Sequence, residues 1–148
     1  MDLMTLPEDN TLNNLFVSEL ETEVAYLSYQ RNVLRVKLKE GILMDIQQME
    51  ELLKKAVKLA DFKKYFAVVD TRANSNSSSD VRDFYAESEY GKYRYADAFI
   101  VDSLAMRLLV NFYISFNKPT VPTKMFTDEE TAMAWINSLK TIADTNRN

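Results

Sequence analysis

Two unbroken apolar runs, each closed by an aspartate, constrain the fold of this chain more than any other feature. They span residues 65–70 and 98–102. An uninterrupted run of this kind is typical of a strand buried on both faces, as in a parallel sheet covered by helices. We therefore predict that the two runs are neighbouring parallel strands of one α/β domain, and that amphipathic helices cover them.

Segments with helical spacing lie between and after these runs. Apolar residues recur at three- and four-residue intervals over residues 46–60, and Asp45 with Gln48 can form a capping box ahead of them. A second helix is expected from Ser79. A third follows Ser103, with a core face made of Ala105, Leu108, Leu109, Phe112 and Phe116. Thr127 with Glu130 reads as a capping box for a last helix.

The N-terminal third of the chain predicts antiparallel strands. Residues 15–17 and 24–29 are rich in strand-forming residues, residues 36–39 alternate with period two, and residues 30–32 can form the turn between the last two strands. Residues 122–126 can add an edge strand, and residues 89–95 a turn or short helix. We expect one domain with a mixed sheet of about five strands and loose tails at 1–11 and 144–148.

The composition excludes several classes of function. The chain has no histidine and no cysteine, so triads built on histidine and zinc sites built on either residue cannot form. Its two glycines lie in no phosphate-binding motif. The net charge of −4 provides no basic surface for nucleic acid. No signal peptide or membrane-spanning run is visible, so we expect a soluble cytoplasmic protein without metal or cofactor.

Two stretches resemble a known family. Residues 66–70, followed by a serine-rich loop and a helix, resemble the STAS-type anti-sigma-factor antagonists. Residues 96–103 continuing to Asn111-Phe112, then Lys118-Pro119 and residues 124–135, resemble the small STAS-like proteins related to them. The resemblance covers roughly residues 24–140 and implies a STAS-like fold and a regulatory, non-enzymatic role.

The resemblance also implies a phosphorylation site. In the antagonists, a serine at the start of the helix after the central strand is phosphorylated, which controls binding to a kinase. The matching positions are Ser77, Ser78 and Ser79, and free N–H groups at a helix start stabilise a phosphate. This chain lacks the glycines that follow that serine in the family, and its loop is longer. The alternative is that Ser79 only caps the helix.

Charged residues at the ends of the two buried strands form a second candidate site. Asp70 and Asp102 should lie at the carboxyl edge of the sheet, where clefts open, with Arg72 and Lys124 near them. Arg72 could then bind an anion or a lipid headgroup. Alternatively, the two aspartates accept hydrogen bonds from loop amides. Acid–base catalysis by this carboxylate pair is a third interpretation.

Two surface features could serve a partner. Arg107 and Asn111 stand four residues apart on one helix, and with Tyr113 they could recognise a protein or a second subunit; a solvated face is the alternative. The tyrosines around Gly91 suit either an interface or the core; they are Tyr85, Tyr90, Tyr93 and Tyr95. Basic and aromatic residues alternate in Lys92-Tyr93-Arg94-Tyr95, but the net negative charge of the chain argues against nucleic-acid binding.

Three functional hypotheses follow. The first is a non-enzymatic STAS-like module that binds a protein partner and forms a homodimer. The second is a carrier or sensor of a small apolar or anionic ligand, of lipid type, held between helices and sheet. The third is an enzyme that uses Asp70 or Asp102. A pocket beside the helix at 104–117 would favour the second hypothesis, a symmetric apolar interface the first, and two facing carboxylates the third.

Overall fold

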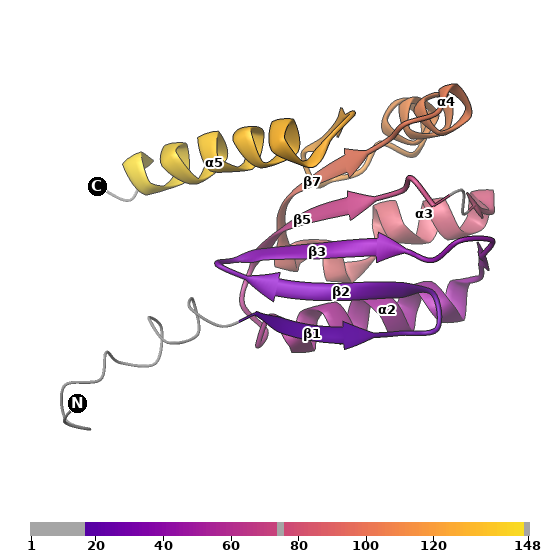
Figure 1. Cartoon of the computed structure of the whole chain (residues 1–148), viewed down its shortest axis with the longest axis horizontal. Coiled ribbons are helices and arrows are strands. Elements are labelled where there is room, and N and C mark those ends of the chain that lie inside the picture. The colour runs from indigo at the N-terminus through magenta and orange to yellow at the C-terminus, as the bar shows by residue number, and fades with distance from the viewer. Residues whose placement is uncertain (1–16, 74–75, 147–148) are drawn as a thin grey trace.

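The structure is a computed structural model, and it describes residues 17–73 and 76–146 (Figure 1). The predicted N-terminal tail at residues 1–11 lies outside the described residues. The predicted C-terminal tail is wrong in part, because the last helix, α5 (Glu129–Asn146), includes residues 144–146.

A six-stranded mixed sheet forms the centre of the molecule, one strand more than the sequence predicted. Its order is β1-β2-β3-β5-β7-β8. The strands are β1 (Ser18–Glu21), β2 (Ala25–Gln30), β3 (Val33–Leu38), β5 (Tyr65–Asp70), β7 (Arg94–Ile100) and β8 (Thr123–Phe126). The first three are antiparallel, and β3, β5, β7 and β8 run parallel. The prediction that the two apolar runs are adjacent parallel strands is confirmed.

The antiparallel part begins later than predicted. β1 starts at Ser18, not within 15–17, and residues 15 and 16 lie outside the described residues. The turn between β2 and β3 is confirmed. Arg31 and Asn32 have φ values of 52° and 68°. Two consecutive positive φ angles are what a two-residue hairpin turn needs to match the twist of its strands.

Helices cover both faces of the sheet (Figure 1). α2 (Ile46–Leu59) and α3 (Ser79–Glu87) pack on one face, and α5 covers β5, β7 and β8 on the other. Alternate residues of β5 therefore enter two separate cores: Ala67 and Val69 pack toward α2, whereas Phe66 and Val68 pack toward α5. Burial on both faces explains why this strand has no polar residue before Asp70.

Short elements complete the helical layer over the first face. β4 (Leu43–Met44) pairs in parallel with β6 (Asn76–Ser77), which leads directly into α3. A 3₁₀ turn, η2 (Glu89–Tyr93), precedes β7, as predicted for residues 89–95. α4 (Leu104–Phe112) continues into a π-helical turn, η3 (Tyr113–Asn117). None of the described helices combines the length and apolar character needed to span a membrane.

Several predicted boundaries are wrong by one or more residues. β7 extends from Arg94 to Ile100, so Asp102 lies beyond the strand and not at its last position. Ser78, not Ser79, occupies the N-cap of α3. Asp128, not Thr127, caps α5, since its carboxylate accepts from the Thr131 amide at 2.8 Å. The capping box of Asp45 and the cap of Ser103 are confirmed.

The predicted core face of α4 is also wrong. Most of that stripe points to solvent: Ala105 is exposed, and Leu108, Phe112 and Phe116 are 60%, 43% and 71% exposed. Leu104, beside the predicted stripe, is 71% exposed. The buried side of α4 instead carries Val110, and that of η3 carries Tyr113. Apolar residues surround most of this helix, so periodicity alone does not tell which of its faces meets the sheet.

Candidate functional site

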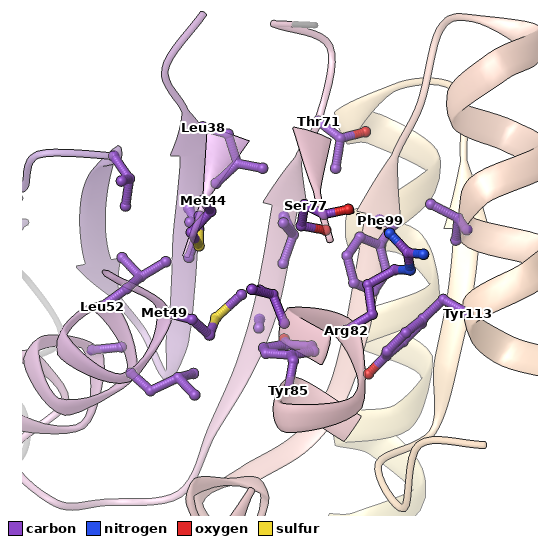
Figure 2. A pocket seen from close by; sticks show the side chains of 18 of the residues that line it. Leu38, Met44, Met49, Leu52, Thr71, Ser77, Arg82, Tyr85, Phe99 and Tyr113 are labelled. Atoms are coloured by element: carbon purple, nitrogen blue, oxygen red, sulfur yellow. Dashed lines mark hydrogen bonds between the residues drawn. The ribbon is translucent and has the colours of Figure 1, made fainter. Parts of the chain in front are cut away.

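An apolar cavity lies between the sheet and the helices α2, α3 and α4 (Figure 2). Its volume is about 130 Å³. The sheet contributes Leu34, Val36, Ala67, Val69 and Phe99; α2 contributes Met49 and Leu52; α4 contributes Met106, Leu109 and Val110. No aspartate or glutamate lines it in the part of the chain that the structure describes. The cavity lies beside the helix at 104–117, where a large internal pocket would favour the second hypothesis.

Arg82 is a cation at the edge of this cavity. Its Nη1 donates to the Ser77 carbonyl at 2.5 Å, and its guanidinium lies 6.0 Å from the centre of the Phe112 ring. Its Nε is buried and has no hydrogen-bond partner among the residues that the structure describes. Within residues 17–73 and 76–146, no carboxylate forms an ion pair with it. A half-buried charge without a counter-ion is unfavourable, so this position suits an anion.

A buried polar cluster lies at another part of the cavity wall. The Arg94 Nε donates to Asp97 Oδ1 at 2.8 Å, and the two side chains are 2% and 0% exposed. The Tyr85 hydroxyl donates to Asp97 Oδ2 at 3.0 Å, and the Arg94 guanidinium lies 4.4 Å from the Tyr85 ring centre. Arg94 Nη1 and the Tyr113 hydroxyl are buried and lack partners among the described residues.

Burial and charge shift the pKa values of this cluster. Burial raises the pKa of Asp97, and the Arg94 guanidinium and the Tyr85 hydroxyl oppose that shift. Burial acts to lower the pKa of Arg94, but Tyr85 and Asp97 outweigh it and raise the pKa above its ordinary value. Burial also raises the pKa values of Tyr85 and Tyr113, so both hydroxyls keep their protons. We conclude that the cluster holds an ion pair and two neutral phenols.

The charged residues at the sheet edge form an ion pair in a second, open hollow, away from the apolar cavity. Asp70 accepts from the Arg72 amide at 3.0 Å and from Arg72 Nε and Nη2 at 3.0 and 2.8 Å. The hydrogen bond from the Arg72 guanidinium lowers the pKa of Asp70. Asp70 raises the pKa of Arg72, with smaller contributions from Asp102 and Glu129. Arg72 is thus surrounded by carboxylates, which disfavours binding of an anion there.

The remaining predicted residues of this edge do not converge on a ligand. Asp102 is exposed. Lys124 is the second residue of β8, and its ammonium group lies 5.7 Å from the Phe126 ring centre. Asp70 accepts a loop amide, as the alternative interpretation expected. No group of acidic side chains suited to a metal ion occurs within the described residues.

The three serines lie where the resemblance placed them, at the start of α3. Ser77 is half-buried and lines the cavity, whereas Ser78 and Ser79 are exposed. The Ser78 hydroxyl donates to the Asp80 carboxylate instead of capping the helix. A phosphate on Ser78 would meet that negative charge. Phosphorylation at these positions stays a prediction.

The partner-binding residues of α4 and the tyrosines have different surroundings. Arg107 and Asn111 are exposed on α4, while Tyr113 is buried. Tyr90 and Tyr93 pack against the core on the α2 side. Tyr95 stacks on Phe66 at 4.9 Å on the opposite face. The tyrosines therefore belong mostly to the core, and Arg94 is a buried ion-pair partner, not a surface cation.

Sequence reasoning missed three residues that shape the cavity: Arg82, Arg94 and Asp97. Arg82 looks like an ordinary exposed-face residue of a short helix. Arg94 and Asp97 could have been found from one sequence signal. They are opposite charges three residues apart, and they flank an otherwise apolar segment of a buried strand. Two buried opposite charges in one strand are expected to pair, and this signal could have placed them inside the domain.

These features define an α/β domain with a mixed sheet covered by helices on both faces and a small apolar cavity under one helical layer. The chain belongs to the family described as Domain of unknown function (DUF7793), which matches residues 27–140. No curated protein matches it. A solved structure of an uncharacterized protein from the DUF3478 family, from Shewanella loihica PV-4, is 19% identical. That match covers 81% of this chain and 91% of the other, with a TM-score of 0.47. That protein is described as having a SpoIIAA-like fold.

Proposed function

We propose that this domain is a non-enzymatic binding domain for a small apolar acid, held in the cavity with its carboxylate on Arg82. The observation that carries the proposal is an apolar cavity of about 130 Å³ edged by an arginine that forms no ion pair with any described carboxylate. A dry apolar cavity of similar size takes up a benzene-sized molecule. The ligand therefore has an apolar body of roughly six carbon atoms.

The energy of the empty cavity supports binding. Residual cavity volume destabilises a core by about 24 cal/mol per Å³. A volume of 130 Å³ therefore corresponds to about 3 kcal/mol, which an apolar ligand of matching shape would recover in part. The carboxylate adds a charge-assisted hydrogen bond to Arg82 Nε, which now has no acceptor.

The test is a titration with hexanoate, followed by amide NMR. We expect the signals of cavity residues such as Ala67 and Leu109 to shift with saturation. Arg82→Gln should weaken hexanoate binding at least tenfold, because it removes the only charge at the carboxylate. Arg72→Gln is the matched control, since Arg72 lies outside the cavity, and it should leave the affinity unchanged. Saturating shifts confined to the surface, or none at all, would contradict the proposal.

A second function is favoured by the exposed face of α4 and η3. The apolar stripe is formed by Leu104, Leu108, Phe112 and Phe116, spaced four residues apart. It offers about 500 Å² of apolar surface, taking roughly 200 Å² for each fully exposed large side chain. Patches of this size on a monomer are often functional. We propose a second copy of this chain as the occupant.

Self-pairing suits this stripe in both area and shape. Two copies crossing antiparallel would set Leu104 against the partner's Phe116, and Leu108 against the partner's Phe112. Such pairing buries about 1,000 Å² in total, the lower limit for a specific interface. Residues four apart form the ridges that pack helix against helix. A regulatory role through another protein and a cytoplasmic location stay predictions.

The oligomeric state tests this second proposal. We expect a concentration-dependent dimer in sedimentation velocity, and Phe116→Ser should shift it to monomer. Ile142→Ser is the matched control, because Ile142 is also exposed but lies on α5, over the other face of the sheet. A monomer at every concentration, or a dimer that Phe116→Ser leaves intact, would refute self-pairing through α4.

A further inference from the structure

The wall of the cavity carries two buried donor atoms without an acceptor of good geometry among the described residues. They are Arg94 Nη1 and the Tyr113 hydroxyl. Each residue is only 4% exposed, and both line the cavity. Burial raises the pKa of the Tyr65 hydroxyl, whereas the Arg94 guanidinium, which also interacts with it, acts to lower this pKa. Buried polar groups in folded proteins are nearly always paired, so two unpaired donors facing one cavity call for an acceptor inside it.

Both donors belong to residues that lie next to one aromatic ring, that of Tyr85. The Arg94 guanidinium is 4.4 Å from the centre of the Tyr85 ring, and the Tyr113 ring centre is 5.9 Å from it. Figure 2 shows Tyr113 beside Arg82, with its hydroxyl pointing away from the Arg82 guanidinium. The donors therefore form a second polar subsite, separate from the one at Arg82.

The charge of this subsite is already balanced. Asp97 accepts from Arg94 Nε at 2.8 Å and is completely buried. A carboxylate placed beside Arg94 would therefore lie near a second buried carboxylate, with one guanidinium between them. Like charges in a buried site are strongly disfavoured. An uncharged oxygen acceptor can use the free donors without that penalty.

We propose that the ligand is an apolar acid with a second, uncharged oxygen acceptor, such as a ketone, ester or amide carbonyl, held by Arg94 and Tyr113. This inference rests on the proposed function, in which the carboxylate binds Arg82. The two subsites bind different parts of the ligand. Arg82 binds the negative end, the apolar walls enclose the chain, and the buried donors select acids that carry a carbonyl over plain fatty acids.

The test compares acids with equal numbers of non-hydrogen atoms. Hexanoate is paired with 4-oxopentanoate, and heptanoate with 5-oxohexanoate, in calorimetric titrations of the whole protein. We expect at least one oxo acid to bind roughly tenfold tighter than its paired fatty acid, as one added buried hydrogen bond allows. Hexanedioate, which brings a second carboxylate, should bind more weakly than either member of the pairs.

Tyr113→Phe isolates the second subsite, because it removes only the hydroxyl. We expect it to abolish the preference, so that each oxo acid binds no tighter than its paired fatty acid. If both oxo acids bind no tighter than their fatty acids, or Tyr113→Phe keeps the preference, the inference is overturned while the proposed function stands. If hexanoate and heptanoate also fail to bind, the proposed function fails, and this inference with it.

Discussion

Replacing Asp97 by asparagine removes the counter-charge of a buried arginine and almost nothing else. The Arg94 and Asp97 side chains are 2% and 0% exposed and joined at 2.8 Å. An asparagine has nearly the shape of aspartate, so the variant creates no cavity. It leaves the Arg94 guanidinium buried with only neutral partners, which is the arrangement that folded proteins avoid most strongly.

The expected loss of stability is large. Removing one partner of a buried ion pair costs about 3–5 kcal/mol, because the other charge stays buried and uncompensated. The amide oxygen of asparagine can still accept from Arg94 or Tyr85, so we expect the lower end, about 3 kcal/mol. A domain of ordinary stability has a free energy of unfolding of about 5–15 kcal/mol, so the variant should still fold but should unfold at a clearly lower urea concentration.

Urea unfolding followed by tryptophan fluorescence measures this loss. The chain has a single tryptophan, Trp135, whose ring lies 5.6 Å from that of Phe126 in the core under α5. Asp70→Asn is the matched control, since it breaks the partly exposed pair with Arg72 and should cost no more than about 1 kcal/mol.

A double-mutant cycle makes the reasoning refutable. Arg94→Met alone and Asp97→Leu alone should each cost about 3–5 kcal/mol, because each leaves the other charge buried and unpaired. The double variant Arg94→Met/Asp97→Leu replaces the pair by apolar side chains and should lie within about 1 kcal/mol of wild type. An Asp97→Asn variant as stable as Asp70→Asn, or a double variant as unstable as the sum of its singles, would show that the pair is not a buried charge pair.

Two further predictions concern the surface. Arg72 holds the pKa of Asp70 below its unfolded value, so this carboxylate stabilises the fold above about pH 4. That contribution is lost as the pH falls through the lower pKa of the folded state. On acidification, Asp70→Asn should therefore lose less unfolding free energy than the wild type, by a difference of less than about 1 kcal/mol. Phe62 is 64% exposed with φ 60°, so Phe62→Gly should stabilise by about 1 kcal/mol in urea unfolding. Phe62→Ala keeps a Cβ atom at this positive φ and therefore keeps the backbone strain. Equal stability of Phe62→Gly and Phe62→Ala would contradict backbone strain as the cause.

The sheet could be predicted because its signals are local. A strand segment buried on both faces is mostly apolar, so β5 and the C-terminal part of β7 are visible in the sequence without knowledge of their neighbours. The hairpin turn at Arg31 and Asn32 and the capping box at Asp45 are also local, since each depends on residues within a few positions. The mixed order of the sheet then follows from short antiparallel connections and long helical crossovers.

The orientation of α4 could not be predicted in the same way. A hydrophobic stripe indicates a buried face only when the opposite face is polar. Here Val110 and Tyr113 on one side compete with Leu108, Phe112 and Phe116 on the other. Which side is buried depends on where β7 ends and how α3 packs, and these are properties of the whole fold. The apolar stripe that the sequence predicted to face the core lies mostly on the surface, and we assign self-pairing to this surface.

The cavity escaped prediction for a related reason. Its walls come from the sheet, α2, α3 and α4, and each wall residue has the apolar character that ordinary packing requires. Only the polar residues distinguish the cavity from an ordinary core. They do so because their donors lack hydrogen-bond partners, and this cannot be seen in a sequence. Asp70 and Arg72 drew attention because they end a strand, yet they neutralise each other. Arg82 was not singled out in the sequence, and Tyr113 and Arg94 were considered only as surface residues, yet all three have donors without partners among the described residues and line the cavity. In this fold the functional signal therefore lies in hydrogen-bonding groups left unsatisfied, and a bound acceptor is the simplest way to satisfy them.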